Sequence, residues 1–138
     1  MNLPERSPGV IETVLVVEDE VLIRMAISEY LRDCGYRVLE AANSDEALVI
    51  LQKQDIQVDV LLTDIDMPGS MSGFGLSQWA RTFRPELEVV LAGTMERAAE
   101  AAAELCHDNP LVKKPYDPQI VVDRIKQLLA ARKRESGG

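Results

Sequence analysis

Short runs of apolar residues alternate with longer amphipathic stretches along the chain. The run over residues 13–17 is continuous and rich in β-branched residues, which is typical of a strand buried on both faces of a parallel sheet. Residues 59–63 and 87–92 predict two more strands of the same sheet. Residues 36–41 and 111–113 predict two further strands. Because helical patterns separate these strands, the order indicates an α/β fold.

Local signals predict where the helices begin and end. Gly35 stands where a left-handed C-terminal cap is expected, and Asn43 with Glu46 forms a capping box for a helix to about residue 54. Further helices are predicted over about 74–83 and 94–105, and a last one after the Asp117-Pro118 pair. Two helices have apolar faces that we expect to point inward: Val21, Leu22, Met25, Ala26 and Leu31 in the first, and Ile120, Val121, Ile125, Leu128 and Leu129 in the last.

Five such units joined by right-handed crossovers predict one doubly wound parallel sheet with helices on both faces. In sheets of this kind the ligand crevice lies at the carboxyl ends of the strands. Glu18, Asp19, Asp64 and Lys114 directly follow the first, third and fifth predicted strands. We therefore expect these four side chains to meet at one edge of the sheet.

Composition and charge narrow the class of protein. The chain of 138 residues is 46% hydrophobic and 28% charged, which suits one soluble domain. We assign residues 1–12 to a flexible tail, 13–131 to the domain and 132–138 to a second flexible tail. The formal charge of −8 argues against nucleic-acid binding, and no apolar run is long enough to span a membrane. We predict a cytoplasmic protein whose partners are other proteins.

The acidic residues at the sheet edge predict a metal site. Carboxylates that are brought together repel one another unless a cation neutralises them, and Mg²⁺ prefers one or two carboxylates with water or phosphate oxygens. Asp19 and Asp64 suit direct ligation, Glu18 suits contact through water, and Lys114 offers a cation to a phosphoryl oxygen. Taken singly, each residue fits an ordinary strand end, helix first turn or exposed lysine. Their convergence favours a shared site.

Three segments carry a family resemblance: VLVVEDE, LLTDIDMPG and KKPY. In this order and spacing they resemble the receiver domain of two-component response regulators, specifically the single-domain type similar to chemotaxis regulators, over roughly residues 14–130. The resemblance implies a flavodoxin-like sheet of order 2-1-3-4-5. It also implies that Asp64 is the phosphoacceptor beside Mg²⁺, that Glu18 and Asp19 are the acidic pair, that the Asp66 carbonyl is a further metal ligand and that Lys114 is the family's lysine.

The sequence departs from the family pattern at two positions. Receivers usually carry Thr or Ser at the end of the fourth strand, where this chain has Gly93, so the hydroxyl is either missing or supplied by Thr94. Many receivers carry an aromatic residue three positions before the lysine, where this chain has Leu111. The first departure predicts weaker stabilisation of the phosphorylated state, and the second argues against an aromatic rotamer switch.

The function implied by the resemblance is a switch rather than a metabolic enzyme. A histidine kinase or histidine phosphotransfer protein would phosphorylate Asp64, and an unknown downstream protein would bind the face formed by the fourth helix, fifth strand and last helix. We expect a monomer or weak homodimer whose only chemistry is Mg²⁺-dependent self-phosphorylation from a donor and slow autodephosphorylation. Two alternatives stay open: a degenerate receiver that binds its partner constitutively, and a phosphatase that uses the Asp64-Ile65-Asp66 sequence.

Overall fold

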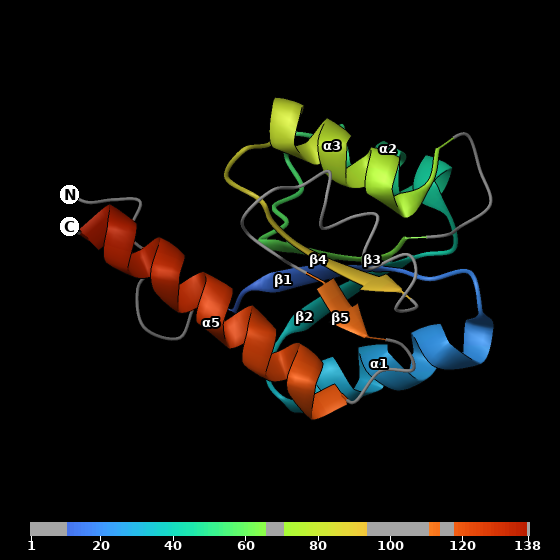
Figure 1. The fold of residues 1–138 in the computed structure, drawn as a ribbon, viewed down its shortest axis with the longest axis horizontal. Helices are drawn as coiled ribbons and strands as arrows, with labels where there is room; N and C mark the ends of the chain where they lie inside the picture. Colours follow the sequence, from blue (N-terminus) through green and yellow to red (C-terminus); the bar gives the residue numbers. More distant parts are fainter. Residues whose placement is uncertain (1–10, 66–70, 94–110, 114–117, 138) are drawn as a thin grey trace.

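A five-stranded parallel sheet forms the centre of the molecule (Figure 1). The computed structural model describes residues 11–65, 71–93, 111–113 and 118–137. The sheet has the order β2-β1-β3-β4-β5, which confirms the predicted flavodoxin-like topology. In chain order its strands are β1 (Thr13–Val17), β2 (Arg37–Ala41), β3 (Val60–Asp64), β4 (Glu88–Gly93) and β5 (Leu111–Lys113).

Helices cover both faces of the sheet, with α1 (Val21–Asp33) and α5 (Pro118–Gly137) on one and α2 (Ser44–Leu51) and α3 (Gly73–Phe83) on the other (Figure 1). Successive residues of β3 contribute to the two cores in turn: Val60 and Leu62 pack on the side of α1 and α5, while Leu61 packs on the side of α2 and α3, as does Ile65 directly after the strand. None of the helices in the described ranges combines the length and apolar composition of a membrane span.

The predicted caps at Gly35 and Asn43 are present, whereas Asp117 lies outside the described residues. Gly35 has a φ of 101° after the end of α1, a backbone conformation that favours glycine. Asn43 Oδ1 accepts a hydrogen bond of 2.9 Å from the Glu46 amide, and Glu46 Oε1 accepts one of 2.7 Å from the Ala42 amide. These contacts satisfy donors at the start of α2 that have no intrahelical partner. The helix predicted over 94–105 lies outside the described residues.

The predicted inward face of α1 was wrong for four of its five residues, and only Leu31 is buried as predicted. Val21, Leu22 and Met25 are exposed by 54%, 80% and 51%, and the buried residues are Ile27, Ser28 and Leu31. The first two turns are apolar nearly all round, so periodicity alone did not single out the buried face. Ile120 of α5 was also predicted to point inward and is 56% exposed.

Helix α5 continues past the predicted end of the domain. The predicted domain ends at residue 131, whereas the helix runs to Gly137. The Arg132 guanidinium donates to Asp59 Oδ1 at 3.2 Å and to the Glu86 carbonyl at 3.3 Å. Because the last helical turns carry charged residues instead of an apolar repeat, the sequence pattern ended too early. For the first tail, residues 1–10 lie outside the described part of the chain.

Ser28 on α1 offers a stability test, because its side chain is fully buried and its hydroxyl has no hydrogen-bond partner within the described residues. We expect Ser28→Ala to raise the free energy of unfolding by about 1 kcal/mol, since it removes a desolvated hydroxyl and improves helix propensity. Urea denaturation measures the change. The matched control is Ser77→Ala on α3, because the equally buried Ser77 hydroxyl donates to the Phe74 carbonyl at 2.7 Å. A gain no larger than that of the control would contradict this expectation.

Candidate metal centre

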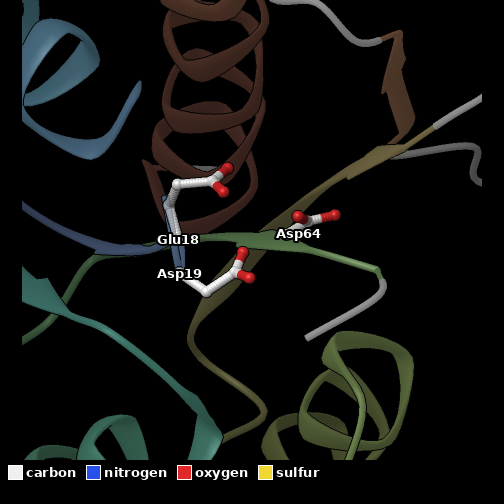
Figure 2. Close-up of side chains that lie close together, drawn as sticks. All are labelled: Glu18, Asp19 and Asp64. Carbon is white, nitrogen blue, oxygen red and sulfur yellow. The ribbon is translucent and has the colours of Figure 1, made fainter. Parts of the chain in front are cut away.

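Three carboxylates meet where β1 and β3 end. Glu18 and Asp19 directly follow β1, and Asp64 is the last residue of β3. These strands are paired in parallel, with Val17 opposite Thr63, so the next residues along each strand share one edge of the sheet. Figure 2 shows the three side chains side by side, and one carboxylate oxygen from each lies within 4.8 Å of the others. The predicted convergence of Glu18, Asp19 and Asp64 is confirmed.

The three acids differ in burial. Glu18 is 0% exposed and Asp64 is 7% exposed, whereas Asp19 is exposed. Negative charges at this separation repel one another, and a divalent cation offsets that repulsion. Oxygen ligands without sulfur or imidazole match a hard cation such as Mg²⁺. The residues present therefore fit a Mg²⁺ site that is open to solvent on the side of Asp19.

Main-chain and side-chain contacts hold Glu18 in place. Its amide donates to the Ala41 carbonyl on β2 at 3.1 Å, and its carbonyl accepts from Arg24 Nη1 at 2.8 Å. Its carboxylate oxygen Oε2 accepts from the Glu20 amide at 3.2 Å. The peptide groups on both sides of Glu18 are thus anchored before the side chain reaches the acidic cluster.

The segment around Asp64 is held by its own main chain. The Ile65 amide donates to the Ala92 carbonyl and the Gly73 amide donates to the Ile65 carbonyl, both at 2.8 Å. The Asp64 carbonyl accepts a hydrogen bond of 3.1 Å from the Thr63 hydroxyl. It also faces Gly73 so closely that a Cβ built on Gly73 would lie 1.5 Å from the Asp64 carbonyl oxygen. The start of α3 therefore requires glycine at this position.

The residues just before α3 are tied to α2. The buried Ser44 hydroxyl donates to the Met71 carbonyl at 2.6 Å, and Ser44 Oγ accepts from the Met71 amide at 3.4 Å. Ser72 then caps α3 by accepting from the Gly75 amide at 3.1 Å. The sequence reasoning missed Ser44, Gly73 and Arg24, because their partners are distant in sequence or are backbone atoms.

The remaining predicted site residues, Asp66, Thr94 and Lys114, lie outside the described residues, and their roles stay predictions. Gly93 is described and ends β4, paired with Lys113 on β5. A Cβ added to Gly93 would lie 2.9 Å from Cδ1 of Ile65. Any residue larger than glycine at position 93 would therefore place its Cβ against the Ile65 side chain.

Comparison with known proteins agrees with this geometry. The chain is 32% identical over 116 residues to the transcriptional regulatory protein ResD of Bacillus subtilis, covering 84% of this chain and 47% of ResD. It is 31% identical over 118 residues to the sensor kinase CckA of Brucella abortus, covering 85% of this chain and 12% of CckA. The chain thus spans about half or less of the length of these relatives.

A solved structure shows the same fold. The receiver domain of a response regulator from Clostridium thermocellum superposes with a TM-score of 0.77 at 26% identity, covering 89% of this chain and 98% of that one. The model of the response regulator receiver domain family matches residues 14–126, which include β3, all of β1 except its first residue, and all three clustered acids. The chain therefore belongs to the receiver domain family of two-component response regulators.

Proposed function

We propose that this receiver is a phosphorylation switch in which Asp64 accepts a phosphoryl group in the presence of Mg²⁺. The observation that carries the proposal is the cluster at the sheet edge, where oxygens of Glu18, Asp19 and Asp64 lie within 4.8 Å of one another. Asp64 ends a central strand, which fixes its backbone, and the residue keeps 7% of its surface exposed. This combination suits a side chain that must meet a donor in a defined orientation.

The proposed reaction is an in-line displacement. A carboxylate oxygen of Asp64 attacks the phosphorus, the bond from phosphorus to the donor atom breaks, and an aspartyl phosphate forms. Bound Mg²⁺ supplies positive charge to the phosphoryl oxygens. Glu18 and Asp19 would hold the ion together with Asp64 and the Asp66 carbonyl. Lys114 would contribute a second cation, and Thr94 a hydroxyl in place of the side chain that Gly93 lacks.

The proposed donor is a histidine kinase or a histidine phosphotransfer protein. A protein donor must approach the edge of the sheet at which Asp64 lies, and the first turns of α1 flank this edge directly after Asp19. Val21, Leu22 and Met25 are exposed there, which offers apolar surface beside the charged cluster. Because the chain carries a net charge of −8, we propose that output runs through contact with a further protein in the cytoplasm and not through nucleic acid. The proposed state is a monomer or weak homodimer.

The decisive experiment is to incubate the protein with Mg²⁺ and a small phosphodonor such as acetyl phosphate and to record its intact mass. We expect the mass of one phosphoryl group to be added, and peptide mapping to place that group on residue 64. A chelator should abolish the addition, because the crowded acids and the phosphoryl oxygens repel one another without a cation. A phosphoryl group on another residue, or labelling that is unaffected by the chelator, would contradict the proposal.

Gly93 motivates a second candidate, a degenerate receiver that binds its partner without phosphorylation. The end of β4 provides no hydroxyl at this position, and Ile65 borders the space where a Cβ would lie. A wild-type protein that stays unmodified, under conditions that label another receiver, would favour this candidate. Sustained turnover of a small phosphate ester would instead favour the phosphatase hypothesis.

A further inference from the structure

Arg24 on α1 reaches back to the turn that carries the acidic pair. It lies within the second turn of the helix, and its Nη1 donates to the Glu18 carbonyl at 2.8 Å. Its Nε donates in a different direction, to Glu40 Oε1 on β2 at 3.3 Å. One planar guanidinium therefore links the Glu18 peptide to the edge strand of the sheet, a two-way contact that a fixed fork of donors makes well.

Glu40 is itself held from two sides. Its second oxygen accepts from Arg32 Nη2 at 3.1 Å, and the same nitrogen donates to the Val38 carbonyl at 3.1 Å. The side chains of Arg24 and Glu40 are 17% and 29% exposed, whereas Arg32 is 46% exposed. The Arg24–Glu40 ion pair, which leads to Glu18, is thus better shielded from solvent than the Arg32–Glu40 pair, so solvent screens it less.

The contacts of Arg24 and Glu40 fix the backbone of Glu18, a member of the acidic cluster. The carboxylates of Glu18, Asp19 and Asp64 repel one another in the absence of a cation, and this repulsion tends to open the turn after β1. The Ala41 carbonyl and the Arg24 guanidinium hold the two peptide groups of Glu18. Both contacts lead to β2, one directly and one through Glu40. The turn is therefore fastened to the edge strand by contacts that do not use the carboxylates of the acidic cluster.

We infer that Arg24 is a positioning residue for the divalent cation site and acts on it through the main chain of Glu18. The inference rests on the proposed function, since it assumes that Mg²⁺ binds the acidic cluster. Arg24 has no acceptor atom and would not itself ligate the ion. Its role is to keep Glu18 and Asp19 in the arrangement that binds the ion, so that binding does not have to order the turn.

The test compares Arg24→Met with Arg32→Met in calorimetric titrations of the metal-free protein with Mg²⁺. Both substitutions remove one positive charge and one contact to Glu40, and methionine keeps the helix propensity. Loss of a positive charge by itself favours cation binding. We nevertheless expect Arg24→Met to weaken Mg²⁺ affinity about tenfold, as is typical when the support of a metal ligand is removed. Arg32→Met should stay within about twofold of wild type, and Arg24→Lys should recover part of the loss.

Urea denaturation in metal-free buffer separates positioning from general stability. If Arg24 is only a structural contact, the two methionine variants will both lose stability while their Mg²⁺ affinities stay equal to wild type, which would overturn the inference.

Glu40→Gln provides a second test, because it weakens the support of Arg24 without altering α1, and a loss of Mg²⁺ affinity is expected there too. Wild-type protein that fails to bind Mg²⁺ would overturn the proposed function and this inference with it. Normal binding by Arg24→Met overturns the inference alone.

Discussion

Asp64→Asn is expected to abolish phosphorylation by a small donor in the presence of Mg²⁺, with no added mass detectable where wild type is fully labelled. Asparagine has nearly the same shape, but its amide is a poor nucleophile and carries no charge for a cation. The substitution removes one of three crowded negative charges, so stability in metal-free buffer should not fall. Intact mass and urea denaturation measure the two effects.

Asp59→Asn is the matched control at the other end of the same strand. Asp59 precedes β3 and is 1% exposed; it accepts from the Thr13 amide at 2.8 Å and from Arg132 at 3.2 Å. Its substitution should lower the free energy of unfolding by about 1–3 kcal/mol, because an amide cannot satisfy all the donors around it. The folded variant should still be labelled. Labelling of Asp64→Asn to the same extent as Asp59→Asn would exclude Asp64 as the acceptor.

Gly73→Ala is expected to be the most destabilising single change near the site. The added Cβ would lie 1.5 Å from the Asp64 carbonyl oxygen and 2.6 Å from the Asp64 carbonyl carbon. Neither atom belongs to a flexible side chain, so β3 or the start of α3 must move. We expect a loss of about 3 kcal/mol in the free energy of unfolding. Urea denaturation measures it, and slower phosphorylation of the folded fraction should accompany it, since the displaced backbone carries Asp64.

Gly75→Ala separates this steric effect from the general effect of a side chain at the start of α3. Its Cβ would lie 3.3 Å from Met71 Cβ, a tight contact that small adjustments relieve. Alanine also gains helix propensity over glycine. We therefore expect stability within about 1 kcal/mol of wild type. Equal losses for Gly73→Ala and Gly75→Ala would show that the close approach to Asp64 is not the cause.

The fold class and the centre of the site could be predicted from the sequence because both follow from local patterns, whereas the strand order was implied by the family resemblance. Continuous apolar runs such as the one before Asp64 identify buried strands, and parallel strands bring their carboxyl ends to one edge. That rule was sufficient to place Glu18 and Asp19 beside Asp64. The capping box at Asn43 and the left-handed Gly35 were also predictable, since each is decided within a few residues.

The supports of the site were not predictable, because each depends on atoms that the fold alone brings together. Arg24 and Glu40 are separated by 16 residues, and on a helix wheel Arg24 looks like any solvated charge. Gly73 lies against the main-chain carbonyl of Asp64, and every residue type has such a carbonyl, so the sequence does not reveal the contact. The exposed position of Leu22 was missed for a different reason: the start of α1 is apolar nearly all round, so only the packed structure distinguishes its buried face.

The contact between Arg132 and Asp59 affects the choice of the C-terminal end when this domain is expressed by itself. The family match ends at residue 126, whereas the guanidinium that reaches the 1% exposed Asp59 carboxylate comes from residue 132. An expression product trimmed to the family boundary would remove that partner from a buried charge at the end of the sheet opposite Asp64. Its poorer yield or lower solubility would then reflect the choice of endpoint and not the character of the domain.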